Sequence, residues 1–506
     1  MFVPILFFLI SINIYSQSHS EKIYQMLWAG FDIKQTSQLL SASQKGVGGI
    51  QIIWGSYSLK DTREVIKKVY SSSNIRPFIA IDYEGGSVYI HQTHGLLNLP
   101  SNMALGVAGD CENTTTMFYL LGLELKKAGI NAVFAPTLDV NTEKNNPIIN
   151  VRAFGSDKET VTKMANSVID GFRAAKIINV VKHFPGHGMT DSDSHLITPV
   201  VNTPSRELYE THIYPFKKII ENNKTDIVML SHIIYKNIDS KNPASLSPEI
   251  IKILRKDLNF KGIILTDSMD MKAITGEYNV EDAAVTAIKN GVDMILIGRN
   301  NMDKIKNAIM NALKKGEISS ERIEESYKRI IDIKNKYRLS EFKIENNEFD
   351  IAYKQIASDI SRKSIKIVKG KPVNLKNNKI KMIFFVPQRF SKESLIIYEK
   401  MKRNGLDVDF TLLSSDKINS VEILNNSNFD TLIIANYSWP KMSEKRFKNI
   451  IKISQKFNKK IFINLLNPVD SQKINNYFDS IIETYGINEY SANAVANELR
   501  EAGGEK

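Results

Sequence analysis

Residues 177–184 read IINVVKHF. It is a run of largely β-branched apolar residues that ends in Lys182, His183 and Phe184. Such a continuous apolar run is typical of a strand that is buried on both faces, as in parallel sheets covered by helices. The stretch therefore predicts a buried parallel strand that presents Lys182 and His183 at its C-terminal end.

Seven further runs of this kind occur between residues 25 and 300, with helix-like segments between them. Strands that alternate with helices form parallel sheets through right-handed crossovers. Eight such units in about 300 residues match a (β/α)₈ barrel, so the predicted fold class is α/β. The seven runs are QMLWAGF (25–31), GGIQIIWG (48–55), PFIAIDYE (77–84), INAVFAPTLDV (130–140), DIVMLSHI (226–233), KGIILTDSM (261–269) and DMILIGRN (293–300).

A smaller set of strand and helix patterns follows the barrel. No Gly-rich fingerprint follows any of these strands, so nucleotide binding is not indicated. The strand candidates are KIKMIFFVP (379–387), DTLIIANYSW (430–439), KKIFINLLNP (459–468) and DSIIETYG (479–486). We expect a TIM-like barrel over residues 21–340, a connector over 341–378 and a smaller C-terminal α/β sandwich domain over 379–506.

Residues 1–20, MFVPILFFLISINIYSQSHS, predict a signal peptide. An apolar run from Phe2 to Tyr15 precedes small polar residues, and it is too short to span a bilayer comfortably. We therefore expect an exported protein, periplasmic or secreted, without a stable membrane anchor. The single cysteine, Cys111, can neither form an internal disulfide nor carry a lipid beside the signal.

The composition is that of a soluble globular protein, with 42% hydrophobic and 24% charged residues. A net charge of +12 could attract an anionic partner such as nucleic acid or cell-wall polymer. We interpret the charge as compositional bias, because the lysines are scattered and no basic stripe is interleaved with aromatic residues. We expect a monomer that binds no nucleic acid.

Several of the apolar runs end in a polar residue. Active sites of (β/α)₈ barrels lie at the C-terminal ends of the strands, where such side chains converge. Taken singly, each residue is expected to make only a structural hydrogen bond. Taken together at one barrel mouth, they favour a catalytic pocket. These residues are Asp82, Asp139, Lys182, His183, His232 and Asp267.

Asp267 is the candidate nucleophile, because it ends a strand and a carboxylate there can attack an anomeric carbon. Asp270 lies one turn later and is better placed to support the site or to start a helix. Asp193 and His195 are the candidate proton-transfer pair. In an irregular loop, the Asp193 carboxylate can contact one imidazole nitrogen of His195 and leave the other for the substrate.

The loop that contains this pair also suggests a metal site. Residues 181–195 read VKHFPGHGMTDSDSH, and their His and Asp residues are a plausible zinc ligand set. Pro185 and Gly186 prevent His183 and His187 from sharing a helical face, so zinc is the secondary interpretation. For His187 we expect instead a hydrogen bond that holds the loop together. We predict no metal and no other cofactor.

KHFPGHG followed by DSH, together with IDYEGG, APTLDVN, PASLS and TDSMDMKAI, resembles glycoside hydrolase family 3, in its β-N-acetylglucosaminidase branch. The resemblance covers the whole barrel. It implies that Asp267 is the nucleophile and that Asp193 and His195 form an acid/base dyad on a mobile loop. It also implies a retaining, exo-acting β-N-acetylhexosaminidase that acts in the turnover of cell-wall or other amino-sugar glycans.

The resemblance further assigns sugar-binding roles to Asp82, Arg152, Lys182 and His183. Cations that donate to hydroxyls and carboxylates that accept from them suit a polyol. One segment departs from the family pattern: where similar enzymes have EGGRVQR, this chain has EGGSVYI (84–90). Both arginines are missing, and Ile90 stands where a substrate-contacting arginine is expected.

Four alternative functions remain open. The first is a β-N-acetylglucosaminide phosphorylase, because a histidine acid/base repels an incoming phosphate less than a carboxylate does. The β-glucosidase branch of the family is another. The missing arginines suggest a non-catalytic sugar-binding protein, and the loop histidines suggest metal-dependent hydrolysis. The complete set of Asp267, Asp193 and His195 favours the hydrolase.

Overall fold

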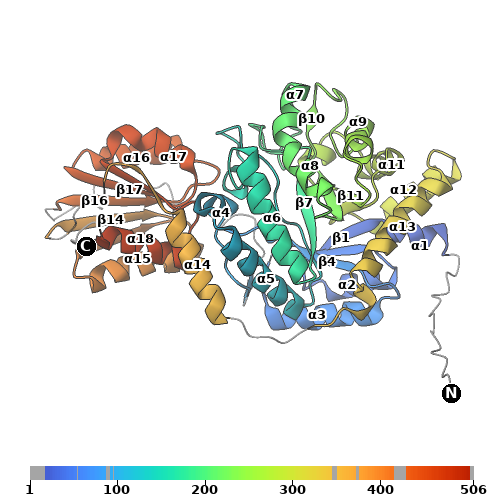
Figure 1. The fold of residues 1–506 in the computed structure, drawn as a ribbon, viewed down its shortest axis with the longest axis horizontal. Helices are drawn as coiled ribbons and strands as arrows, with labels where there is room; N and C mark the ends of the chain where they lie inside the picture. The colour runs from blue at the N-terminus through green and yellow to red at the C-terminus, as the bar shows by residue number, and fades with distance from the viewer. Residues whose placement is uncertain are drawn as a thin grey trace, which may run out of the picture.

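The computed structural model describes residues 17–53, 55–86, 92–94, 96–344, 350–371, 375, 377–414 and 429–501. Figure 1 shows a barrel of strands and helices joined by α14 to a second, smaller α/β domain. The apolar run expected to be a signal peptide and Ile90 lie outside the described residues. Among those described, no helix is long and apolar enough to cross a membrane.

Eight parallel strands form the barrel in the order β11-β9-β7-β6-β4-β2-β1-β12, so strands that follow one another in the chain lie side by side. Backbone hydrogen bonds from Met294 to Ile264 (3.1 Å) and from Thr266 to Met294 (3.2 Å) join the two end strands. Each strand falls within one of the eight apolar runs, which confirms the predicted barrel. The strands are β1 (Leu27–Phe31), β2 (Gly49–Ile52), β4 (Phe78–Ile81), β6 (Ala132–Val133), β7 (Ile178–Phe184), β9 (Ile227–Leu230), β11 (Ile263–Thr266) and β12 (Ile295–Gly298).

Helices surround the barrel (Figure 1). The main ones are α1 (His19–Gln25), α2 (Thr36–Gln44), α3 (Leu59–Ser72), α4 (Asn102–Ala108), α5 (Cys111–Ala128), α6 (Lys158–Ala174), α8 (Tyr214–Glu221), α9 (Pro248–Lys252), α10 (Lys272–Thr275), α11 (Val280–Lys289), α12 (Met302–Lys314) and α13 (Ser320–Lys336). Shorter turns are η1 (Asn150–Arg152), α7 (Ser205–Glu207), η2 (Leu208–His212), η3 (Ile253–Asp257) and η4 (Leu339–Glu341). Small strand pairs join β3 (Ser56–Ser58) to β5 (Gln92–His94) and β8 (Val200–Val201) to β10 (Ile234–Tyr235).

The sequence explains why these helices form and pack. In α3, the buried residues Thr62, Ile66, Val69 and Tyr70 recur at helical spacing and make one apolar face. The hydroxyl of Ser58 accepts a 3.0 Å hydrogen bond from the backbone of Asp61 and caps the first turn. Such a cap stabilises a helix by about 1 kcal/mol, whereas burial of the apolar face decides where the helix lies.

The barrel interior is filled with large side chains that require small neighbours. Trp28 of β1 is fully buried and stacks on Phe78 of β4, with ring centroids 5.2 Å apart. The adjacent strand has Gly49 at the point of contact, where an added Cβ would lie 2.3 Å from the Trp28 ring. A glycine there lets the strands approach, so Gly49→Ala would force the indole out of its place.

The second domain is a six-stranded sheet in the order β13-β18-β17-β16-β14-β15, with only β13 antiparallel. Its strands are β13 (Lys366–Lys369), β14 (Lys379–Phe385), β15 (Asp407–Leu413), β16 (Thr431–Asn436), β17 (Lys459–Asn464) and β18 (Ser480–Glu483). The four predicted strands are present. The structure adds β13, from the segment expected to be a connector, and β15 at the sheet edge.

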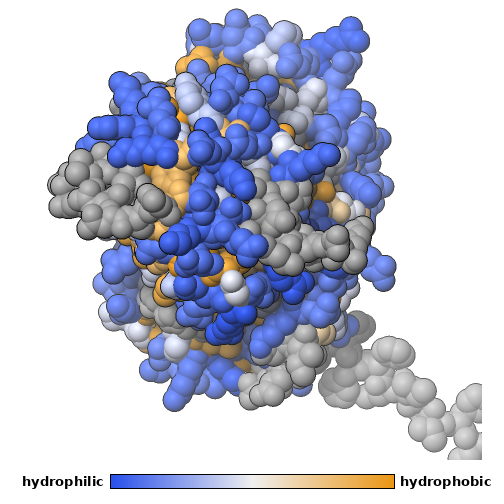
Figure 2. Space-filling model, turned by 90° about the vertical axis from the view of Figure 1, so that its left-hand side faces the viewer, coloured by the Kyte–Doolittle hydropathy of each residue, from blue (hydrophilic) through white to orange (hydrophobic). Residues whose placement is uncertain are grey.

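Helices cover both faces of this sheet, so the domain is the predicted α/β sandwich (Figure 1). One face packs α15 (Ser391–Arg403) and α18 (Glu489–Glu501), and the other packs α16 (Glu444–Ser454) and α17 (Pro468–Ile474). Turns η5 (Gln388–Phe390) and η7 (Asn475–Tyr477) complete it. The side of the molecule drawn in Figure 2, which the second domain forms, is mostly hydrophilic with small hydrophobic areas.

The two domains touch through α14 (Asp350–Ser364) and through polar contacts at the edge of the barrel. Ser101, at the start of α4, donates a 2.6 Å hydrogen bond to the Tyr485 carbonyl. Asn150 donates a 2.9 Å hydrogen bond to the side chain of Asn467, and Val151 packs into the core of the second domain. The second domain therefore contacts the turn η1, which carries Arg152.

Candidate active site

Asp267 lies directly after β11, at the C-terminal mouth of the barrel. Its carboxylate accepts a 2.7 Å hydrogen bond from the backbone N–H of Ser268. Burial opposes ionisation, but electrostatic interaction with His183 and then His232, together with the Ser268 N–H and, last, His195, outweighs it and lowers the pKa of Asp267. Asp267 is therefore an ionised carboxylate near neutral pH, as a nucleophile must be.

Asp193 and His195 form a hydrogen-bonded pair in the loop after β7. The Asp193 Oδ1 lies 2.9 Å from the His195 Nδ1 and accepts a 2.8 Å hydrogen bond from the His195 backbone. Partial burial opposes the charge on Asp193, but the bond to His195 outweighs this and lowers the pKa of the carboxyl. Because a carboxylate accepts, Nδ1 carries a proton, and proton exchange with a substrate falls to Nε2. The His195 side chain is 44% exposed, so it stands at the solvent-facing edge of the mouth.

Lys182, Arg152 and two carboxylates form a largely buried ionic network at the same end of the barrel as Asp267. The Lys182 Nζ lies 2.6 Å from Glu84 and 3.0 Å from Asp82. Arg152 binds Glu84 through two hydrogen bonds of 2.8 Å. Burial alone would raise the pKa of Glu84, but Arg152 and Lys182 lower it well below its usual range. The network fixes charged donors and acceptors in a site shielded from water, which suits the binding of sugar hydroxyls.

His183 and His187 have different partners. The His183 Nδ1 lies 2.7 Å from the buried carboxylate of Asp139. The backbone of His187 donates a 2.6 Å hydrogen bond to the same carboxylate, and its Nε2 lies 3.0 Å from the hydroxyl of Ser194. Burial lowers the pKa of His187 to about 4, so this ring is neutral near pH 7. His187 thus ties the loop to the barrel, which confirms its predicted structural role.

The loop that carries the dyad also touches the segment after Asp267. The backbone of Ala273 in α10 donates a 3.2 Å hydrogen bond to the Ser194 carbonyl. Directly after His195, Leu196 is 71% exposed and Ile197 is 56% exposed. The dyad is therefore bordered by apolar side chains that face solvent.

His232, just after β9, and Asp270, in the loop after Asp267, support the site. His232 is fully buried between the Ser245 hydroxyl (2.7 Å from Nδ1) and the Ser268 carbonyl (3.1 Å from Nε2). A carbonyl only accepts, so Nε2 donates, and burial lowers the pKa of His232 and keeps it neutral. Asp270 accepts a 2.6 Å hydrogen bond from Ser268 and a 3.3 Å bond from the Arg299 backbone. It supports the loop after Asp267, as expected.

The structure brings together every site residue expected from the sequence. Glu84 was missed, although it binds both Lys182 and Arg152. A signal existed: Asp82 and Glu84 are two residues apart at a strand end, where alternate side chains point to the same side. Among the described residues, no three His, Cys, Asp or Glu side chains could together hold a metal ion, so the zinc interpretation has no ligand set there.

A strand-end carboxylate, a carboxylate–imidazole pair and a buried network that suits hydroxyls, all at one barrel mouth, are typical of glycoside hydrolases of the (β/α)₈ type. The family model for the glycosyl hydrolase family 3 N terminal domain matches residues 18–333. The chain belongs to glycosyl hydrolase family 3, which confirms the resemblance found in the sequence.

Curated relatives match the barrel. Beta-hexosaminidase A of Pseudoalteromonas piscicida is 34% identical over 290 residues, which are 53% of this chain and 48% of that protein. The chain thus spans about half the length of that relative. The beta-hexosaminidase of Tolumonas auensis is 32% identical over 278 residues, which are 53% of this chain and 79% of that protein.

A solved structure matches both domains. It is a glycoside hydrolase family 3 beta-N-acetylglucosaminidase from Paenibacillus sp. str. FPU-7, with a TM-score of 0.88 and 26% identity. The match covers 96% of this chain and 97% of that one. The barrel and the sandwich domain therefore occur together, in this arrangement, in a known member of the family.

Proposed function

We propose that the protein is a retaining, exo-acting β-N-acetylhexosaminidase that removes terminal N-acetylglucosamine through a covalent glycosyl-enzyme. The Asp193–His195 pair supports this proposal most directly, because its 2.9 Å hydrogen bond prepares an imidazole to carry a proton near an ionised carboxylate. The names of the matched relatives point the same way.

In the first step, the Asp267 carboxylate attacks the anomeric carbon while the bond to the aglycone oxygen breaks. His195 Nε2–H gives its proton to the leaving oxygen, and Asp193 stabilises the imidazolium before transfer. The products of this step are a free alcohol and a sugar esterified to Asp267. The charge on Asp267 is available for attack because its pKa is lowered despite burial.

In the second step, the neutral His195 takes a proton from water. The resulting hydroxide attacks the anomeric carbon and releases Asp267, so two inversions give net retention. The imidazole is suited to both roles because the same ring nitrogen donates a proton when the ring is charged and accepts one when it is neutral.

The buried network holds the sugar in this proposal. Lys182 and Arg152 donate to hydroxyls while Asp82 accepts from them, and Glu84 balances the two cations. His183, held by Asp139 at 2.7 Å, presents its other ring nitrogen to the same space. Preorganised donors of this kind favour a bound sugar because they lose little freedom on binding.

Export and a role in cell-wall or other amino-sugar glycan turnover belong to the same proposal. The apolar run from Phe2 to Tyr15 supports export, and the family resemblance supports a glycan substrate. A β-N-acetylglucosaminide phosphorylase is the second candidate, because an imidazole acid/base at Asp193–His195 repels an incoming phosphate less than a carboxylate would. Incubation with and without inorganic phosphate separates the two by the product, free sugar or sugar 1-phosphate.

The deciding experiment is a panel of aryl β-glycosides of N-acetylglucosamine, N-acetylgalactosamine and glucose. We expect hydrolysis of the first, with the β-anomer released first when the product is followed by NMR. Asp267→Ala should lose turnover by several orders of magnitude, whereas Asp270→Asn should keep more of it. Preference for glucose would reject the proposed branch, and near-normal turnover by Asp267→Ala would reject the nucleophile.

A further inference from the structure

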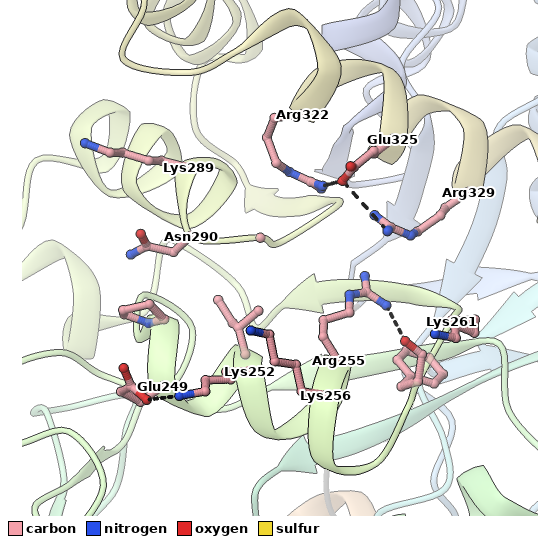
Figure 3. Close-up of a pocket in the computed structure, with 14 residues that line it drawn as sticks. Glu249, Lys252, Arg255, Lys256, Lys261, Lys289, Asn290, Arg322, Glu325 and Arg329 are labelled. Atoms are coloured by element: carbon pink, nitrogen blue, oxygen red, sulfur yellow. Dashed lines mark hydrogen bonds and ion pairs between the residues drawn. The ribbon is translucent and has the colours of Figure 1, made fainter.

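A basic cavity of about 560 Å³ lies at the opposite end of the barrel from Asp267. Its wall includes Phe260 and Lys261, just before β11, and Gly291, just before β12, so it opens at the amino ends of the strands. Figure 3 shows the side chains of α9 and η3 on one side of this opening and those of α13 on the other. The cavity is thus separate from the proposed sugar site.

Positive charge dominates the lining. Seven Lys and Arg side chains line the cavity, against the carboxylates of Glu249 and Glu325. Glu325 is already bound to Arg322 at 2.6 Å, and Glu249 lies 3.5 Å from Lys252. The lining therefore keeps a large excess of positive charge that its own acidic residues do not neutralise.

A buried carboxylate behind the cavity fixes three of the cations. Asp293 is fully buried and binds Arg322 at 2.8 Å and Arg329 at 2.9 Å, and it also binds Arg255. Glu325 is a second carboxylate that contacts Arg322 and Arg329, so two carboxylates face three guanidinium groups and one positive charge is left over. In addition, the buried Nε of Arg322 has no hydrogen-bond partner among the described residues. The arginines are thus held in place while part of their charge is not neutralised.

A second basic cavity, of about 640 Å³, lies at the same end of the barrel. Lys176 in its wall comes shortly before β7, and six Lys and Arg side chains face the single carboxylate of Glu341. Helix α13 lines the first cavity with its first half and ends at the second. Two basic cavities therefore lie at the amino end of the barrel.

We propose that the cavity between η3 and α13 binds a phosphate-bearing anion with several negative charges. Guanidinium groups match the geometry of phosphate oxygens, and the exposed ammonium groups of Lys256, Lys261 and Lys289 add attraction at the rim. A volume of about 560 Å³ accommodates more than one phosphate group. The site does not depend on the sugar chemistry at the other end.

The test uses the full chain and measures binding of inorganic tripolyphosphate by titration calorimetry. The variant Lys256→Gln/Lys261→Gln/Lys289→Gln removes charge at exposed positions and leaves the arginines that hold Asp293. A matched control removes the same charge from the second domain, at exposed Lys402, Lys445 and Lys452. We expect saturable binding that weakens about tenfold or more in the cavity variant, stays unchanged in the control, and falls with salt.

Co-sedimentation of the protein with phosphatidylglycerol vesicles shows whether the bound phosphate belongs to a lipid headgroup or to a soluble molecule. Lysine-dependent sedimentation supports the site with a lipid headgroup as ligand, and tripolyphosphate binding without sedimentation supports it with a soluble or polymeric phosphate. Absence of saturable binding to the unmodified protein, or an equal loss in both lysine variants, would overturn the proposal. Hydrolysis of the aryl glycoside should be the same in all three proteins.

Discussion

The side chain of Asn150, in the barrel, donates a 2.9 Å hydrogen bond to the side chain of Asn467, in the second domain. Asn150 adopts a left-handed conformation with φ of 41° and begins the turn η1 that ends at Arg152. The neighbouring Val151 packs into the core of the second domain. The position of Arg152 therefore depends on a domain that contains none of the other predicted site residues.

Asn150→Gly should raise the KM of an aryl N-acetylglucosaminide several-fold and change kcat less. Glycine tolerates the left-handed backbone, so the change removes the bond to Asn467 without new strain. Tyr353→Phe is the control, because it removes a hydrogen bond from α14 to the Asn98 carbonyl, away from η1. Steady-state kinetics on the three proteins checks this. An unchanged KM in Asn150→Gly would show that the second domain does not position Arg152.

Glu84→Gln should weaken both folding and sugar binding. The substitution leaves the buried cations Lys182 and Arg152 without the carboxylate that pairs them, which costs about 3 kcal/mol of stability. Urea unfolding measures the loss, and KM should rise together with it. The control Glu64→Gln removes a carboxylate from an exposed pair with Lys67 and should have no measurable effect.

Asp193→Asn should reduce kcat by roughly 10²- to 10⁴-fold and flatten the pH profile, because the amide cannot stabilise the His195 cation. The loss should be smaller for a substrate with a good leaving group, which needs less protonation. Asp191→Asn, in the same loop, is the matched control, since Asp191 bonds to the hydroxyl of Ser192. Equal losses for good and poor leaving groups would contradict the acid role.

Stability should fall as the pH is lowered from 6.5 towards 4. Burial lowers the pKa of His187 to about 4, so the unfolded chain binds a proton in this window that the folded chain does not. Burial also lowers the pKa of His212 to about 4, so His212 contributes to the same loss of stability. For His187 the shift corresponds to about 3 kcal/mol. Thermal unfolding at several pH values measures it, and His187→Gln should reduce the slope. If His187→Gln leaves the dependence of stability on pH unchanged, groups other than His187 cause the loss of stability.

The barrel could be predicted from the sequence because its strands are buried on both faces and read as continuous apolar runs. β15 was missed because it lies at a sheet edge, where residues such as Asp407 and Asp409 are exposed. β13 was missed for the same reason, since Lys366 and Val368 are exposed. Edge strands lack the apolar run that identifies a buried strand.

The candidate site was predictable where a residue ends a strand or belongs to a motif, as with Asp267 and His195. Asn150 was not predictable, and the strand-end position of Glu84 indicated a site residue but not its partners, because both residues bind groups far away in the chain. Glu84 binds Arg152 across 68 positions, and Asn150 binds Asn467 across 317. Such pairings depend on how the barrel closes and on how the second domain docks, and local sequence patterns contain neither.

Under the proposed function, the contact between η1 and the second domain separates the part of the chain that adjusts sugar affinity from the part that breaks bonds. Changes around Asn467 reach Arg152 through packing and one hydrogen bond, without substituting an ionisable group near Asp267. On that proposal, we expect natural variation or directed evolution in the second domain to change which glycans are held and to leave the proton-transfer chemistry unchanged.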